Sequence, residues 1–270
     1  MRRYLYAAGV LLLLGLLVTA VFAPQLAPHD PYAADITAKY LKPSAQYPLG
    51  TDYLGRCTAS RMIWGVRPTL GYALLTMGLT ISVGTLMGVV SGYFGGWADS
   101  VLSFVIQLLL SIPSQIMIFV IVALVGNSML TVVIAMAAIK WAWYAKMVRD
   151  EVISLSGLPY VQFAEITGAP PLQVLKRHIL PNLLPYLAVL ASLNLSWSLL
   201  NLTALSFLGF GIAPPAAEWG AMLNEARQVM LIHPEQMVFP GVAITLTAAA
   251  IHLAGDALNE MLLVKEPLHE

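Results

Sequence analysis

Residues 69–93 carry the sequence TLGYALLTMGLTISVGTLMGVVSGY, a stretch of 25 residues without one charged side chain. This stretch is longer than the ~20 residues that a helix needs to cross the hydrocarbon core of a bilayer. Within it, Gly84, Gly88 and Gly92 recur every four residues and therefore line one helix face, where a neighbouring helix can approach closely. The stretch predicts a membrane-spanning helix with a packing face.

The composition of the whole chain points to the same class of protein. Of the 270 residues, 59% are hydrophobic and 10% are charged, whereas a soluble domain carries about 25% charge. The formal net charge of zero leaves no basic field to attract nucleic acid, and a single cysteine, Cys57, excludes an internal disulfide. We expect an all-α integral membrane protein with six transmembrane helices. The spans are expected at residues 4–23, 69–93, 100–125, 128–147, 183–207 and 237–254.

The first apolar run has two interpretations. Arg2 and Arg3 precede it like the basic region of a secretory signal, and Val21 and Ala23 offer small residues for cleavage. The run over residues 4–23 is, however, longer than the roughly 7–15 residues of a signal core. We predict a retained first helix, and a cleaved signal is the alternative.

Basic residues give the expected orientation. Six crossings place both termini on one side, and Arg2 and Arg3 favour the cytoplasm as that side. The loop between the fourth and fifth spans adds Lys146, Arg149, Lys176 and Arg177. The signal is weakened because the loop after the first helix also carries basic residues. Those are Lys39, Lys42, Arg56, Arg61 and Arg67.

Aromatic and basic residues gather where the fourth predicted span ends. Trp141, Trp143 and Tyr144 lie between Lys140 and Lys146. Aromatic rings favour the headgroup level, and long amines reach toward it. We therefore interpret Lys140 as an interfacial anchor and not as a charge at mid-membrane.

The cytoplasmic segment 148–182 is longer than a turn between two spans requires. Gly168 suits the end of one helix, and Pro170 and Pro171 suit the first turn of the next. The pattern predicts two short helices, over 159–167 and 170–180, that lie against the membrane and offer a surface to another protein. A further short helix, over 222–230, is expected in the external loop 208–236.

The sequence from Tyr160 to Asn182, YVQFAEITGAPPLQVLKRHILPN, resembles the cytoplasmic coupling loop, or EAA motif, of ABC-importer permeases. Its ending, Arg177 to Asn182, is similar to the dipeptide, oligopeptide and nickel branch of that family. Three other blocks are similar to the same branch. They are Leu49 to Arg56 with Ser60 and Arg61, Leu205 to Gly211, and Gly255 to Leu258. Residues 141–149 and 217–228 resemble permeases for nickel or metal chelates more than those for peptides.

The resemblance implies an ABC type I importer fold and a permease subunit that forms half of a translocation pore. Such a subunit is not an enzyme, and a separate partner ATPase drives it. It implies four kinds of partner: a second homologous permease, two ATPase subunits that bind ATP and Mg, an extracytoplasmic solute-binding protein, and membrane lipid. This chain itself binds no cofactor, and its place is the bacterial cytoplasmic membrane. The implied cargo is nickel ion or a metal chelate, with a dipeptide or oligopeptide as the alternative.

The resemblance also assigns coupling to the ATPase to a set of loop residues. They are Tyr160, Gln162, Ala164, Gly168, Ala169, Arg177, His178 and Pro181. The chain departs from the family where Gln162 replaces the carboxylate that usually opens the motif, and where Glu165 stands in place of a basic or polar residue. A salt bridge from position 162 is therefore not expected.

Other functional classes lack their motifs. No Gly-x-x-x-x-Gly-Lys-Ser/Thr segment occurs, so the chain has no phosphate-binding loop of that kind. His-Glu-x-x-His and Gly-x-Ser-x-Gly are also absent, which argues against an intramembrane enzyme of those types. A secondary transporter usually shows buried carboxylates and an internal repeat, and the sequence shows neither.

A polar stripe is the candidate lining of the pore. Asn194, Ser198 and Asn201 fall on one face of the fifth predicted span. Gln107 lies in the third, near a kink expected at Pro113. The alternative is that these groups hydrogen-bond to neighbouring helices.

The five histidines are scattered and predict no firm metal site. His252, in the sixth predicted span, is a speculative ligand for a passing ion, and an interfacial hydrogen bond is its alternative role.

Three regions are expected along the chain. Residues 1–68 form an N-terminal transmembrane helix and an external segment, residues 69–258 form the permease domain with its coupling loop 148–182, and residues 259–270 form a cytoplasmic tail. The external segments 23–66 and 208–236 are the expected contact surface for the solute-binding protein.

Overall fold

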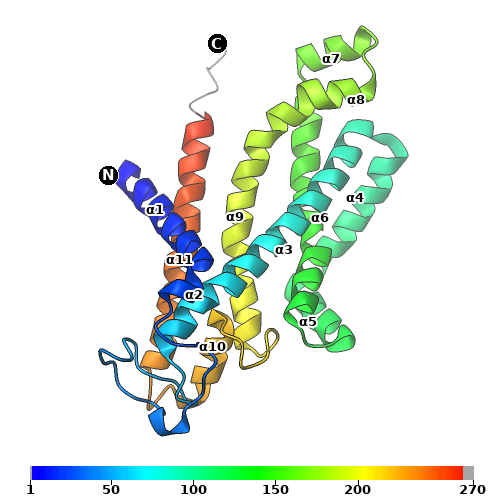
Figure 1. Ribbon diagram of the computed structural model, residues 1–270. Coiled ribbons are helices and arrows are strands. Elements are labelled where there is room, and N and C mark those ends of the chain that lie inside the picture. Colours follow the sequence, from blue (N-terminus) through cyan, green and yellow to red (C-terminus); the bar gives the residue numbers. More distant parts are fainter. Residues whose placement is uncertain (1, 264–270) are drawn as a thin grey trace. The chain divides into compact units, whose positions relative to one another are not determined.

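The computed structural model describes residues 2–263, and this part of the chain is helical with no strand (Figure 1). Five continuous helical segments are long and apolar enough to cross a membrane. They are α1 (Arg2–Val21), α3 (Thr58–Phe94), α6 (Met129–Ser156), the run from α8 (Pro171–Val174) through α9 (Leu180–Phe207), and α11 (Glu235–Leu263). The predicted all-α membrane fold is confirmed.

The third predicted span is broken in the middle. It consists of α4 (Gly96–Ser111) and α5 (Ser114–Val125), whose axes differ in direction by 88°. Pro113 lacks a backbone N–H and disfavours helical geometry at the preceding residue. Ile112 is accordingly extended, with φ −104° and ψ 134°. The kink predicted at Pro113 is confirmed, and it is sharper than a proline bend within one helix.

The contacts at the two ends of the bent pair compare its reach with the length of α6. The Arg149 guanidinium donates to the Asp99 carboxylate at the start of α4, with distances of 2.6 and 2.8 Å. At the other end, α5 finishes at Val125, just before α6 begins at Met129. From Met129 to Arg149 the helix rises about 30 Å, which is roughly the thickness of the hydrocarbon core. The candidate spans therefore number five, or six when this bent pair is counted as one span.

The boundaries of α6 bear on the position of Lys140. The helix continues to Ser156, beyond the predicted end at residue 147. Lys140 stands eleven residues after Met129, so it lies about 16 Å from the start of the helix. The aromatic residues beside Lys140 therefore do not mark the end of the helix. The role of Lys140 as an interfacial anchor stays a prediction.

By contact density the chain divides into two compact units, which we describe separately. The first comprises Met1–Leu75, Val125–Val133 and Leu195–Ala254, and the second comprises Thr76–Leu124, Ile134–Asn194 and Gly255–Glu270. Residues 264–270, which belong to the predicted cytoplasmic tail, lie outside the described residues.

In the second unit, the glycine face of α3 packs against α6. A β-carbon added at Gly84 would lie 2.5 Å from Cβ of Tyr144, and one at Gly88 would lie 2.7 Å from the Ala145 carbonyl oxygen. Gly92 approaches the Arg149 carbonyl in the same way, at 2.7 Å. These distances leave no room for a side chain, so the predicted packing face is confirmed.

In the first unit, short elements lie between the long helices. They are α2 (Ala23–Leu26), η1 (Ile36–Ala38), α10 (Trp219–Ala226) and η3 (Arg227–Val229). The helix predicted over 222–230 begins earlier, because Glu218 accepts hydrogen bonds from Gly220 and Ala221 and so caps α10. Helix α1 packs on α11 at Gly9, where an added β-carbon would lie 2.7 Å from Cβ of Leu253.

Candidate functional site

The segment between α6 and α9 contains two short helices that lie together (Figure 1). They are α7 (Pro159–Ile166) and α8 (Pro171–Val174), and one π turn, η2 (Leu175–Ile179), joins α8 to α9. Both helices begin with a proline near the N-terminus, where its fixed φ suits the first turn and its missing N–H costs nothing. The helix pair predicted within the coupling loop, residues 148–182, is present.

Gly168 produces the bend between the two helices. Its φ is +83°, a left-handed conformation that glycine adopts without strain. The Gly168 N–H donates to the Glu165 carbonyl at 3.0 Å, and the Ala169 N–H donates to the Ala164 carbonyl at 3.1 Å. These two bonds form a Schellman motif that satisfies the carbonyl groups at the end of α7. The predicted role of Gly168 as a helix terminator is confirmed.

The underside of the coupling loop is packed against the long helices of its own unit. Val161 of α7, Val174 of α8 and Ile179 of η2 are fully buried. The core cluster around η2 combines side chains of α6 and α9 with those of η2. Its members are Tyr144, Val148, Val152, Leu155, Leu175, Ile179, Leu183 and Leu190. A displacement of the loop therefore moves α6 and α9 with it.

Polar contacts tie the loop together at the start of α9. The Asn182 amide donates to the Tyr160 hydroxyl at 3.1 Å and to the His178 carbonyl at 2.6 Å. The rings of Tyr160 and His178 lie 5.9 Å apart. A further hydrogen bond joins Tyr93 of α3 to Glu165 of α7. Tyr160 and His178, two of the residues assigned to coupling, are thus neighbours, and Glu165 connects α7 to α3.

The opposite side of the loop exposes large apolar side chains. Phe163 is 67% exposed, Ile166 84% and Leu172 62%. Around them the assigned residues Gln162, Gly168, Arg177 and Pro181 are exposed, whereas Ala164 and Ala169 are partly covered. Sequence reasoning did not single out Phe163, Ile166 and Leu172. The three-residue spacing of Phe163 and Ile166 on one helix face was the available signal.

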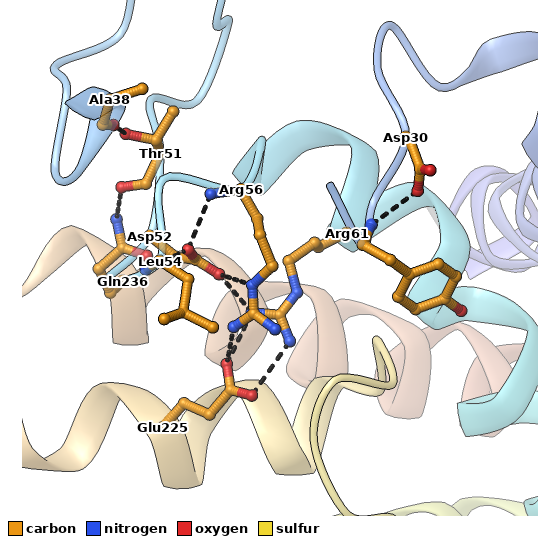
Figure 2. A network of polar contacts seen from close by, with 10 residues as sticks. Asp30, Ala38, Thr51, Asp52, Leu54, Arg56, Arg61, Glu225 and Gln236 are labelled. Carbon is orange, nitrogen blue, oxygen red and sulfur yellow. Dashed lines mark hydrogen bonds and ion pairs between the residues drawn. The ribbon is translucent and has the colours of Figure 1, made fainter. Parts of the chain in front are cut away.

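A second polar site lies in the first unit, where four buried charged residues meet (Figure 2). The Asp52 carboxylate accepts from Arg56 Nε at 2.7 Å and from Arg61 Nη1 at 2.5 Å. Glu225 of α10 accepts from the same two arginines, at 2.9 and 2.6 Å. Arg56 and Arg61 are 0% and 1% exposed. Two positive and two negative charges balance, as buried ions require.

A tight turn holds this network in place. Asp52 Oδ1 also accepts from the N–H groups of Leu54 and Arg56, at 2.9 and 3.0 Å. Gly55 adopts φ +75°, and a β-carbon there would lie 1.7 Å from the Asp35 carbonyl oxygen, so no other residue fits. The family resemblance included the block that contains Arg56 and Arg61. Their partner Glu225 is 164 residues away from Arg61, and no spacing rule connects the two.

Glu218 anchors α10 beside this network. Its carboxylate accepts from the N–H groups of Gly220 and Ala221, both at 2.8 Å, and from the Ser206 and Thr69 hydroxyls at 2.6 and 3.3 Å. Burial raises the pKa of the Glu218 carboxyl, and these hydrogen bonds oppose the shift. The neighbouring tryptophan ring is buried as well. The segment 23–66 and α10 are therefore joined by buried polar groups rather than by a loose surface contact.

The predicted pore-lining residues have different environments within the chain. Asn194 and Ser198 are buried, with exposed fractions of 2% and 0%. Asn201 is half-buried and donates to the Trp197 carbonyl of its own helix at 2.9 Å. Gln107 is exposed on α4. The pore-lining assignment of these four residues stays a prediction.

The histidines do not gather. His252 is exposed on α11, and within residues 2–263 no three side chains from histidine, cysteine, aspartate and glutamate are placed to hold a metal ion. His233 instead stacks on Tyr40, with ring centroids 4.0 Å apart, and contacts Glu235 at 3.0 Å. A role for His252 in ion passage stays a prediction.

Comparison with known proteins connects the coupling loop to one family. Residues 84–263 match the family described as binding-protein-dependent transport system inner membrane component. Residues 2–43 match the N-terminal TM domain of oligopeptide transport permease C. The first match covers the coupling loop, and the second covers α1 and part of the external segment.

Curated relatives align along nearly the whole chain. Nickel transport system permease protein NikC of Escherichia coli (strain K12) is 38% identical over 245 residues, 90% of this chain and 88% of that protein. Glutathione transport system permease protein GsiD of Pectobacterium atrosepticum is 36% identical over 266 residues, 97% and 87% of the two chains. Metal-staphylopine import system permease protein CntC of Staphylococcus aureus (strain NCTC 8325 / PS 47) is 34% identical over 263 residues, which cover 96% of this chain and 91% of that protein. The chain therefore belongs to the binding-protein-dependent transport system inner membrane components, as a multi-pass permease subunit of an ABC importer.

Proposed function

We propose that this permease forms half of a translocation pore with a second, homologous permease and that two ATPase subunits drive it. The ATPases bind ATP and Mg, and an extracytoplasmic binding protein delivers the cargo. The observation that carries the proposal is the coupling loop, a bent helix pair with an apolar outer face and a packed underside. The chain itself contributes no phosphate-binding loop.

The loop is suited to transmit movement from the ATPase. Phe163, Ile166 and Leu172 supply the apolar side chains for a cleft in that partner. Because Leu175 and Ile179 are buried among side chains of α6 and α9, a shift of the loop is passed on to both helices. Gly168 fixes the angle between α7 and α8, so the two parts move as one element.

The coupling loop also sets the proposed orientation. An ATPase is cytoplasmic, so the loop and both termini face the cytoplasm, and residues 259–270 form a cytoplasmic tail. The external segment and α10 then face outward, where the network of Asp52, Arg56, Arg61 and Glu225 makes them a stable surface for the binding protein. In this proposal, residues 1–68 form the N-terminal transmembrane helix and the external segment, and residues 69–258 form the permease domain.

For cargo we propose nickel ion or a metal chelate. The names of two relatives, which refer to nickel and to metal-staphylopine, support metal import. A peptide is the second candidate, because other relatives are named for glutathione and for D,D-dipeptides. The proposed path runs along the face of α9 that carries Asn194, Ser198 and Asn201, with Gln107 of α4 and His252 of α11 as further contacts.

Purification and uptake test this function together. We expect affinity purification of this chain in mild detergent to recover the second permease and two copies of the ATPase. Reconstituted with the binding protein, the complex should take up radiolabelled nickel or dipeptide only when ATP is hydrolysed. A homodimer of this chain that is fully active without any ATPase would contradict the proposal.

A further inference from the structure

A hollow lies where α4 and α5 separate. Its volume is about 320 Å³, and its wall consists of residues 109–114 on one side and Ile139, Lys140 and Trp143 of α6 on the other. The lining residues include Ser111, Ser114 and Lys140, whose side chains are polar. The hollow is thus polar, although it lies within the most apolar part of the sequence.

Lys140 is the only charged side chain in that part. Residues 4–29, 68–93, 100–139, 179–217 and 236–251 contain no aspartate, glutamate, lysine or arginine. Lys140 lies about 16 Å along α6, near the middle of the ~30 Å from Met129 to Arg149, and it is half-buried. A charge at this depth is costly in lipid and therefore faces either other protein or a water-filled cavity.

The broken backbone beside Lys140 requires the same surroundings. At Ile112 and Pro113 the chain leaves helical geometry in the middle of a crossing. Non-helical backbone at this depth occurs where it is buried in protein or lines a cavity that holds water. The lysine and the break share one hollow, and a position of this hollow on the water-filled path of the assembled pore would satisfy both.

We propose that Lys140 is a cargo-contacting residue and that its ammonium binds a carboxylate of the cargo at the break between α4 and α5. The inference rests on the proposed function, because a cargo contact requires a pore. It narrows the cargo to molecules that carry a carboxylate, either the organic part of a metal chelate or the C-terminus of a peptide. A bare divalent cation is repelled by the same ammonium at mid-membrane.

The structure also offers a simpler role, which the experiment must separate. Lys140 lies beside the C-terminal end of α4, where unpaired carbonyl groups favour a cation. A lysine that only stabilises this helix end would affect every cargo equally and would lower the stability of the complex. A cargo contact affects carboxylate-bearing cargo selectively.

The test uses the complete importer in membrane vesicles with three probes: radiolabelled nickel as the aqua ion, the anionic nickel–citrate complex, and radiolabelled dialanine. Lys140→Met removes the charge at nearly constant length, and Lys140→Arg keeps it. Lys146→Met is the matched control, since Lys146 is an exposed lysine on the same helix, away from the hollow. Thermal midpoint and basal ATP hydrolysis are measured for each variant.

We expect Lys140→Met to lower uptake of a carboxylate-bearing probe at least tenfold at limiting concentration, with Lys140→Arg and Lys146→Met within threefold of wild type. Loss of nickel–citrate uptake identifies a chelate as the cargo, and loss of dialanine uptake identifies a peptide. Uptake of the aqua ion alone by wild type would overturn the inference, as would unchanged uptake in Lys140→Met. A uniform loss for all probes together with a lower thermal midpoint would also overturn it.

Labelling separates failure of this inference from failure of the proposed function. In a Cys57→Ser background, Lys140→Cys should react with small water-soluble thiol reagents, at least tenfold faster than a cysteine at Ile134, an exposed apolar position further inside the same apolar helix. Protection of position 140 would remove the lysine from the path even if ATP-driven uptake persists. Absence of ATP-driven uptake of all three probes by wild type would instead contradict the proposed function.

Discussion

Replacing Gly168 tests how far the bend of the coupling loop determines its action. The residue has φ +83°, and a β-carbon built on it meets no atom within 4 Å. A side chain there produces no clash, so its cost is that of the left-handed backbone alone, about 1–2 kcal/mol. A cost of this size reduces the population of the capped bend roughly 5–30-fold relative to competing loop geometries.

We therefore expect Gly168→Val to insert and assemble but to lose most of its ATP-driven uptake. The transmembrane helices are untouched by the substitution, and β-branching adds further strain to a left-handed residue. Gly168→Asn should be milder, because asparagine tolerates this conformation better than other residues with side chains. The measurement is the ratio of cargo transported to ATP hydrolysed in proteoliposomes.

The matched control is Gly157→Ala at the other end of α7. Gly157 does not have a positive φ, and its added β-carbon would approach backbone oxygens of α6 no closer than 3.3 Å. This variant should transport like wild type. Normal coupling in Gly168→Val, at an assembly level equal to the control, would refute the argument that the bend sets the geometry of the loop.

Three other predictions follow from the buried groups. Glu225→Leu leaves two buried guanidinium groups with one carboxylate and should destabilise the complex by about 3–5 kcal/mol, which a lower thermal midpoint would show. Gln228→Leu, on the exposed side, should not lower the midpoint. Equal midpoints for the two variants would contradict the stabilising role of the network. Cysteines at Asn194, Ser198 and Asn201 of α9 should react with water-soluble thiol reagents in a Cys57→Ser background, and a cysteine at Leu200, on the opposite face, should not. Protection of all three positions would assign these polar residues to helix packing. Because burial raises the pKa of Glu218 above its usual value, the folded state binds more protons. Wild type should then gain thermal stability relative to Glu218→Gln as the pH falls from 8 toward 5, and a parallel pH dependence of the two would show that the shift is absent.

The fold could be predicted largely because its determinants are local in sequence. Apolar runs define the crossings, Pro113 breaks a helix wherever it occurs in one, and Gly168 ends α7 by its own backbone preference. The glycine face of α3 follows from a four-residue period, and it packs as expected. Each of these features depends on a few consecutive residues.

The parts that sequence reasoning missed depend on contacts between distant segments. Glu225 meets Arg61 across 164 residues, so its partner role has no local signature. The end of the fourth span was predicted too early because the aromatic residues around Lys140 resemble an interfacial belt, whereas α6 continues for sixteen residues after Lys140. The exposed apolar face of Phe163 and Ile166 could not be predicted, because apolar residues at helical spacing usually form the buried face of a helix.

The central claim is that the apolar face of the coupling loop holds the ATPase. Ile166 is the most exposed of its large side chains, at 84%, so Ile166→Asp should leave the fold of this chain unchanged and place a charge in the contact. The direct measurement is the amount of ATPase recovered with the purified permease pair. We predict that Ile166→Asp removes the ATPase while both permeases still purify together, and recovery of the ATPase at the wild-type level would contradict the account.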